Sequence, residues 1–198
     1  MKHLKIILSV FLTMLLFLAG CAPSALTVSE EDIGTGKVFI INLMHLYGDR
    51  STAEIVGGII SGGKQTHRNA DQVYLFINKA YLSGLAAYGT GGATMAELLT
   101  VTPQKNAEIQ MDIYKHFPKK LIGIKKINMD LEPEKLYAFV TEVEKSTENI
   151  HIDVYSISTD QLREIIKRSK GLSTFEFAEL NYEYITNNEK VYSFNSFD

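Results

Sequence analysis

The chain of 198 residues contains a single cysteine, Cys21. One thiol cannot form an intrachain disulfide, and it cannot build a zinc module that needs several thiolate ligands. Because Cys21 closes an N-terminal apolar run, the sequence after it has no thiol at all. The folded part of the protein is therefore not a cysteine peptidase, a thiol oxidoreductase or a cysteine-dependent metal module.

Basic residues are not concentrated anywhere in the chain. Residues 21–198 carry 18 lysines and arginines against 23 aspartates and glutamates, a net charge of −5, and the basic residues form no long run. A chain of this kind has no electrostatic footprint for nucleic acid. It also has no electrostatic reason to adhere to anionic lipid headgroups, so membrane attachment would depend on acyl chains.

Only one long apolar run occurs, Ile6 to Gly20, and its 15 residues fall short of the roughly 20 that a membrane-spanning helix needs. Lys2 and Lys5 precede the run, and small residues close it, which is the arrangement of an export signal. The closing residues Leu18-Ala19-Gly20-Cys21 resemble the lipobox of bacterial lipoproteins at every position. The resemblance implies cleavage before Cys21 and acylation of its sulfur and its new amino group, palmitate being one such acyl group.

Ala22 would be the second residue of the mature protein that this resemblance implies. Lipoproteins that stay in the inner membrane typically carry Asp there. In a cell with two membranes, the resemblance therefore implies sorting to the periplasmic side of the outer membrane.

Three segments are expected along the chain: a signal peptide over residues 1–20, the lipidated cysteine and a flexible tether over 21–36, and a single globular domain over 37–198. The tether is predicted because Ala22 to Gly36 is rich in small and acidic residues and has few apolar anchors. A flexible chain of that length reaches roughly 20 Å. The alternative is that part of this segment packs against the domain as an irregular arm.

Hydrophobic periodicity divides the domain into strands and helices that largely alternate. The segment 73–78 also fits part of a helix over residues 70–88, and the strand is preferred. Strands are expected at Lys37–Met44, Val73–Asn78, Ala107–Ile113, Leu121–Leu131 (with a bulge near Lys125-Lys126) and Ile150–Ile157. Helices are expected from Ser51 to Gly62-Gly63, from Thr94 through Leu99, from Pro133 through Val143, and from Thr159 to Lys170 with Gly171 as cap.

The C-terminal region is expected to be an antiparallel hairpin, with strands Thr174 to Ile185 and Lys190 to Phe197 around Asn187-Asn188. Its aromatic side chains either pair across the two strands or form an exposed face that docks an envelope protein or a glycan. These side chains are Phe175, Phe177, Tyr182, Tyr184, Tyr192, Phe194 and Phe197.

The order of elements indicates an α/β fold: a layered single domain with a mixed sheet and this C-terminal antiparallel hairpin. An α+β fold is the alternative.

A ligand crevice is predicted where the first two strands end, provided that they are parallel. Their following loops would then leave the same edge of the sheet, and each would lead to a helix N-terminus whose free amides favour an anion. The candidate crevice residues are His45, Asp49, Arg50, Ser51, Thr90, Gly91, Gly92 and Thr94. Glu54 and Glu97 already lie near these helix starts, so a weak, neutral-to-anionic site is expected. The alternative is two ordinary capped turns.

No enzyme motif survives inspection of its context. Gly89-Thr-Gly-Gly92 is not followed by Lys-Ser/Thr, as a phosphate-binding Walker loop would be, and it lacks the glycine spacing of a dinucleotide site. Ser61-Gly-Gly-Lys64 matches the Ser-x-x-Lys of penicillin-recognising enzymes, but its glycines end a predicted helix instead of opening one.

The strand, helix, second strand and glycine-bearing turn between Lys37 and Tyr114 resemble the small sulfur-relay domains of the DsrE type. Members of that family that relay sulfur use a cysteine after a later strand. This chain has none there, so the resemblance concerns the fold pattern and not the activity.

The histidines that follow Cys21 are His45, His67, His116 and His151. They form no helical metal motif, so no metal and no cofactor are expected. A Ser/His/Asp arrangement assembled in space stays open, because such triads are recognised by geometry and not by sequence order. The main functional expectation is a membrane-anchored, non-catalytic binding or assembly module of the cell envelope that binds no nucleic acid. The alternative is a small cysteine-independent hydrolase or anion-binding enzyme that uses the predicted crevice.

Overall fold

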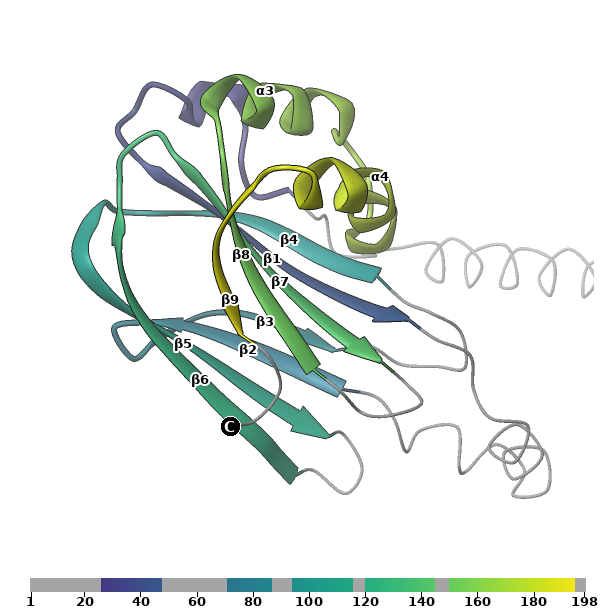
Figure 1. The fold of residues 1–198 in the computed structure, drawn as a ribbon. Helices are drawn as coiled ribbons and strands as arrows, with labels where there is room; N and C mark the ends of the chain where they lie inside the picture. The colour runs from purple at the N-terminus through teal and green to yellow at the C-terminus, as the bar shows by residue number, and fades with distance from the viewer. Residues whose placement is uncertain (1–25, 48–70, 87–93, 116–119, 145–149, 195–198) are drawn as a thin grey trace, which may run out of the picture.

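A computed structural model of the chain describes residues 26–47, 71–86, 94–115, 120–144 and 150–194 (Figure 1). Its described part consists of two stacked β-sheets, with two helices on the far side of one of them. The three layers are therefore helices, five-stranded sheet and four-stranded sheet, in that order.

The five-stranded sheet has the order β4-β1-β7-β8-β9 and is mixed. β1 and β7 are parallel, and every other neighbouring pair in this sheet is antiparallel. The strands are β1 (Val38–Tyr47), β4 (Thr94–Val101), β7 (Leu136–Glu144), β8 (Ile150–Ile157) and β9 (Glu189–Phe194).

The four-stranded sheet has the order β3-β2-β5-β6 and is antiparallel throughout. Its strands are β2 (Asp71–Ile77), β3 (Ala80–Ala86), β5 (Gln104–Lys115) and β6 (Lys120–Leu131). The two helices are α3 (Thr159–Arg168) and α4 (Thr174–Thr186), and a short 3₁₀ helix, η1, spans Glu30–Asp32.

β1 is the centre of the molecule because it is apolar on both faces. Ile40 and Met44 point into the core between the two sheets, whereas Phe39, Ile41 and Leu43 point into the core beneath the helices. All five side chains are fully buried. The continuous apolar run read from the sequence is thus the signature of a strand covered on both sides.

The fold is mostly β and fits α+β, the alternative, better than α/β. The mixed sheet was correctly expected. The expected parallel pairing of the first two strands is wrong, because β1 and β2 lie in different sheets. The helices follow one another in sequence and cover one face, instead of alternating with strands.

Two expected helices are strands. The segment after Pro133 is β7, and the segment from Thr94 is β4. In β7, Leu136, Ala138 and Val140 face the helices while Tyr137 and Phe139 face the other sheet. A strand buried on both faces has apolar residues at helical spacing too, and this explains the misreading.

The C-terminal hairpin is also wrong, because its first arm is the helix α4. Ser173 caps this helix by accepting from the backbone N–H of Glu176, and the Glu176 carboxylate accepts from the backbone N–H of Ser173. Asn188 ends the helix with its side-chain amide, which donates to the carbonyl of Tyr184 at 2.6 Å. Only the second arm is a strand, β9, and it pairs with β8.

The other expected elements within the described residues are confirmed. β2 holds the segment 73–77 in place of the competing helix, and β5, β6 and β8 match their predicted segments. In α3 the predicted inward side chains Leu162, Ile165 and Ile166 are buried, and Gly171 follows the helix with φ +81°. The bulge expected at Lys125-Lys126 is absent, since the β5–β6 ladder runs regularly through these residues. The helix expected from Ser51 lies outside the described residues.

The segment that precedes β1 packs as an arm from Leu26 onward, which was the alternative to a fully flexible tether. Leu26 bridges to Leu98 of β4, and Val28 is buried in the core beneath the helices. Further along, the Glu134 carboxylate accepts from the backbone N–H groups of Gly34 and Gly36. Residues 26–36 are therefore part of the folded unit.

Candidate functional site

The structure brings together two of the eight crevice residues, His45 and Thr94. They face each other in the β1–β4 ladder, and the His45 Nδ1 lies 2.7 Å from the Thr94 Oγ1. Thr94 opens a strand, so it offers no helix amides to an anion. The other six, Asp49, Arg50, Ser51, Thr90, Gly91 and Gly92, lie outside the described residues.

His45 is a packing residue between the sheet and α4. Its ring stacks on Tyr182, with centroids 4.2 Å apart and an interplanar angle of 24°. The Tyr182 hydroxyl donates to the carboxylate of Glu142, which neighbours His45 in the β1–β7 ladder. These contacts join α4 to the ends of two parallel strands.

A second polar cluster surrounds Asp153 on β8. Lys190 of β9 places its Nζ 2.5 Å from Oδ2, the Tyr155 hydroxyl donates to the same oxygen at 3.2 Å, and the His151 Nε2 lies 2.9 Å from Oδ1. The Asp153 side chain is only 5% exposed. Neighbouring side chains therefore stabilise its charge in place of water.

Burial and charge act against each other at this cluster. Burial alone would raise the pKa of Asp153, but hydrogen bonds from Lys190 and Ser193 together with the nearby His151 lower that pKa below its ordinary value. Burial raises the pKa of the Tyr155 hydroxyl, and the Asp153 carboxylate raises it further. The cluster is thus an ionised carboxylate beside a neutral phenol.

The Ser/His/Asp arrangement left open by the sequence meets here but does not form a relay. The Ser193 Oγ lies 3.5 Å from the His151 Nε2, and the Asp153 carboxylate contacts that same nitrogen. A catalytic histidine uses one nitrogen for the nucleophile and the other for the carboxylate. In the described residues no group of three or more histidines, aspartates or glutamates could hold a metal. The cluster fastens β9 to β8, and we assign it no catalysis.

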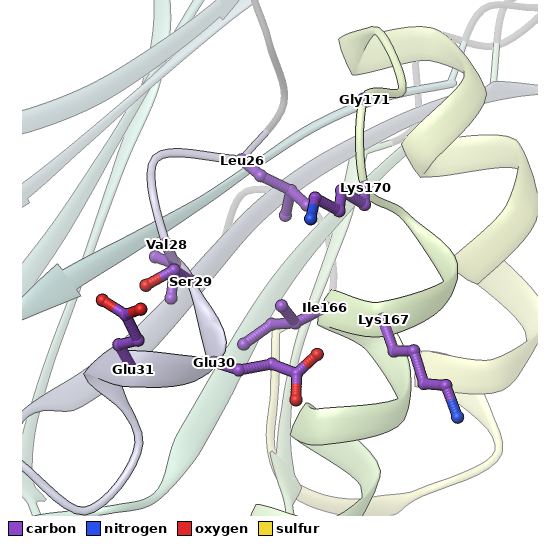
Figure 2. Close-up of a pocket in the computed structure, with 9 residues that line it drawn as sticks. All are labelled: Leu26, Val28, Ser29, Glu30, Glu31, Ile166, Lys167, Lys170 and Gly171. Atoms are coloured by element: carbon purple, nitrogen blue, oxygen red, sulfur yellow. The ribbon is translucent and has the colours of Figure 1, made fainter.

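A groove of about 640 Å³ lies between the arm and the end of α3 (Figure 2). Apolar side chains of both elements line it, Leu26 and Val28 from the arm and Ile166 from α3. Its charged side chains are two carboxylates, Glu30 and Glu31, and two ammonium groups, Lys167 and Lys170. Equal numbers of opposite charges favour neither an anion nor a cation, so we assign this groove no ligand.

A third region is the outer face of the four-stranded sheet, the face turned away from the five-stranded sheet. Both described helices lie beyond the five-stranded sheet, so neither covers this face (Figure 1). We define the outer face by twelve residues: Gln72, Tyr74, Phe76, Tyr81, Gly84, Ala86, Gln110, Asp112, Tyr114, Leu121, Ile124 and Lys126.

The ladders arrange the outer face as three rows across the strands. The first row runs Tyr81, Phe76, Gln110, Lys126; the second runs Gly84, Tyr74, Asp112, Ile124; and the third runs Ala86, Gln72, Tyr114, Leu121. Each row therefore carries an aromatic ring next to an amide or carboxylate side chain.

The rings of the outer face contact one another. Tyr74 meets Tyr114 edge to face with centroids 5.5 Å apart, and Phe76 meets Tyr81 in the same way at 5.9 Å. Tyr74 and Tyr81 lean over Gly84, where an added Cβ would lie 2.7 Å and 2.8 Å from their side-chain atoms. The side chain of Tyr81 is 62% exposed, as large as any exposure among the hydrophobic side chains described.

The polar members of the outer face are held in place between the rings. Gln110 donates its Nε2 to the Asp112 Oδ1 at 2.7 Å, and the Tyr74 hydroxyl donates to the Gln72 Oε1 at 3.0 Å. Asp112 is only 9% exposed although it lies on a solvent-facing surface. Its neighbours in the row, Tyr74 and Ile124, flank it on both sides.

The sequence contained part of this surface. The alternation in Ala107–Ile113 correctly placed Gln110 and Asp112 on an exposed face of β5. Tyr74 and Phe76 were missed, because β2 is apolar at nearly every position and was read as buried on both sides. Their period-two alternation with Val73 and Leu75 was the available signal.

Comparisons with known proteins place the chain in no family. No protein-family model matches it, and no curated protein matches it. A solved structure from Bacteroides ovatus, described as a "putative cell adhesion protein", is similar over 62% of this chain and 44% of that chain, with 8% identity and a TM-score of 0.31. The present chain spans less than half of that protein, and a similarity at this level carries nothing over. No helix in the described ranges is long and apolar enough to cross a membrane.

Proposed function

We propose that this protein is a lipid-anchored binding module of the bacterial cell envelope, attached through Cys21, that presents the outer face away from its membrane. It acts by binding and not by catalysis. The observation that carries the proposal is the position of the two surfaces: the arm enters on the helix side of the molecule, and the outer face lies on the opposite side.

The arm supports a short connection to the membrane. Four residues separate Cys21 from Leu26, and an extended chain of that length reaches at most about 17 Å. Because Leu26 and Val28 pack into the core beneath the helices, the domain would be held close to the bilayer in a restricted set of orientations. A lipid-anchored domain with a free tether of residues 21–36 would have no such preference.

The outer face would then point outward. It is separated from the anchor side by both sheets, which alone add a layer spacing of about 10 Å. The exposed ring of Tyr81, together with half-buried rings beside it and interleaved amides, is well suited to binding. Such rings offer large contact area at low cost in side-chain entropy. The clusters at His45 and Asp153, by contrast, use their polar groups to join elements of the fold.

The test of anchoring compares the wild-type chain with Cys21→Ser in the native host. We expect the wild-type protein to take up a fatty-acid probe and to fractionate with membranes, outer membranes where the cell has them. The Cys21→Ser variant should lose the label and retain the longer precursor on a gel. Labelling of the variant would refute the anchor.

The test of orientation introduces one cysteine at a time, Lys170→Cys or Lys126→Cys, into two proteins: the lipidated chain on proteoliposomes and the unlipidated Cys21→Ser chain in solution. The rate of reaction with a membrane-impermeant maleimide is measured for each. Lys170→Cys should react more slowly in the lipidated protein than in the unlipidated one, whereas Lys126→Cys on the outer face should react equally in both. Equal protection at both positions would contradict the outward orientation.

A further inference from the structure

We propose that the outer face binds an extended polysaccharide of neutral or weakly charged sugar rings. This inference rests on the proposed binding function and names its ligand class. The aromatic rings would stack on the sugar rings, and the amides and Asp112 would accept hydrogen bonds from sugar hydroxyls.

The rings supply the stacking surface. The negative face of an aromatic ring attracts the weakly positive C–H groups of another molecule, and a tyrosine adds a hydroxyl that can donate or accept. Tyr81 offers this combination with its largely exposed ring. Tyr74 lies beside it, and both side chains pack over Gly84, which leaves room for them because it has no Cβ. The outer face therefore carries a group of neighbouring rings with Tyr81 as its most exposed member.

The polar groups of the outer face favour a glycan over a protein as its ligand. Asp112 lies in the middle row with its side chain more than nine-tenths buried, and within the described residues Gln110 is its one hydrogen-bond donor. A protein that covered this face with an apolar core would bury the carboxylate further without pairing it, which is costly. A polysaccharide brings many hydroxyl donors to the same point.

Charge is consistent with a neutral chain as ligand. The Lys126 Nζ lies 3.5 Å from the Glu108 Oε1, so the positive charge of Lys126 is already balanced by a neighbouring carboxylate. The remaining charge on the outer face is that of Asp112, which disfavours strongly acidic polymers. Gln72 and Gln110 are neutral and suit hydroxyl and acetamido groups.

The experiment titrates the full-length lipidated protein, purified in detergent, with chitohexaose and cellohexaose by calorimetry, and sediments it with purified peptidoglycan sacculi. The chain has ten tyrosines and no tryptophan, so tyrosine fluorescence gives a second readout of ring contact. We expect saturable binding of at least one of these glycans. Soluble oligosaccharides and sacculi separate a general glycan surface from one specific for the cell wall.

Two variants test whether binding uses the outer face, and a third is their control. Tyr81→Ala and Asp112→Asn should each weaken glycan affinity at least tenfold. Tyr192→Ala is the matched control, because Tyr192 is 37% exposed on β9 and lies outside the outer face. Its affinity should stay within twofold of wild type.

The outcomes separate this inference from the proposed function. Absence of binding to all three glycans, or an equal loss in Tyr192→Ala, overturns the polysaccharide inference. If a purified envelope protein is instead captured in a way that Tyr81→Ala abolishes, the glycan is the wrong ligand and the binding module stands. If Asp112→Asn unfolds the chain by circular dichroism, Tyr81→Ala decides alone, since Tyr81 is largely exposed.

Discussion

Asn42 and Ser83 join the two sheets through the core: the side-chain amide of Asn42 donates to the Ser83 Oγ at 2.9 Å. Ser83 in turn donates to the Glu97 carboxylate at 2.8 Å, so β1, β3 and β4 share one polar chain. Asn42 and Ser83 are both almost fully buried. A polar group in such a place stabilises the fold only while its partner is present.

Ser83→Ala should therefore destabilise the protein by about 1–3 kcal/mol, because the buried Asn42 amide loses its acceptor. Urea titration measures the change in the free energy of unfolding. The control is Ser156→Ala, which removes the same hydroxyl group from a half-buried position on β8 and should cost less. Ser158→Ala would be a poor control because Ser158 caps α3. A loss below about 0.5 kcal/mol in Ser83→Ala would mean that water replaces the lost hydroxyl.

Phe139→Ala should cost about 3–5 kcal/mol, since Phe139 is 1% exposed in the core between the sheets. Phe175→Ala is the matched control, because the same residue type is 47% exposed on α4 and its loss should cost far less. Both variants are compared with wild type by thermal and urea unfolding. Similar losses in the two variants would contradict the assigned burial.

Phe139 shows which structural features hydrophobic periodicity can predict and which it cannot. Its burial could be predicted from the sequence, but its element could not, because Leu136, Phe139, Val140 and Val143 satisfy both helical spacing and a strand covered on two sides. β5 was predictable since one of its faces meets water, and the alternation of Ile109 and Gln110 is then unambiguous. Sequence patterns thus identify half-exposed elements better than central ones.

α4 was misread for a different reason. Its aromatic density favoured a strand, yet Ser173 and Glu176 form a capping box that was available in the sequence. Phe177, Asn181 and Ile185 then follow at intervals of four and are all buried. The local start signal was the better guide.

The candidate surface was even less accessible from the sequence, because it depends on pairing between distant segments. Gln110 and Asp112 could be placed on an exposed face, but their neighbours Phe76 and Tyr74 come from β2, more than thirty residues earlier. Nothing local in either strand specifies that register. The premise of the predicted crevice failed at the same step, since it required β1 and β2 to share a sheet.

Asp153→Asn tests the polar cluster between β8 and β9 through its pH dependence. The pKa of Asp153 is lowered in the folded protein, so its ionised form stabilises the fold above the unfolded pKa of about 3.9, and this contribution is lost as pH falls through the folded pKa. At pH 7 the variant should be less stable by about 1.5–3 kcal/mol. The difference in the free energy of unfolding between the variant and the wild type should become smaller as the pH is lowered below about 4.

Asp160→Asn is the control for this titration. Its side chain is 94% exposed and lies 3.6 Å from Arg163, so the surface pair should contribute less than about 0.5 kcal/mol at any pH. Urea unfolding of the wild type, Asp153→Asn and Asp160→Asn is measured from about pH 3 to about pH 7, because carboxylates titrate at the acidic end of this range. A constant gap between wild type and Asp153→Asn would show that the charge of Asp153 is not what stabilises β9.

Gly84→Ala tests whether the outer face is a built arrangement of rings. The backbone at this position tolerates alanine, but the new Cβ would lie 2.7 Å from the Tyr74 Cδ1 and 2.8 Å from the Tyr81 hydroxyl oxygen, so both rings must move. Because these rings border solvent, they can turn outward, and the expected cost is about 1 kcal/mol, at the low end for overpacking. The near-ultraviolet circular dichroism of tyrosine should change at the same time.

The decisive form of this experiment is a double-mutant cycle. In a Tyr74→Ala background the nearest obstacle to the Cβ is gone, so Gly84→Ala should cost less there than in the wild type, by at least about 0.5 kcal/mol of coupling. The Tyr81 hydroxyl remains, and a triple variant with Tyr81→Phe should remove the rest of the penalty. Equal costs in all backgrounds would mean that the rings move freely away from Gly84, and the outer face would then lack the rigidity that selective binding requires.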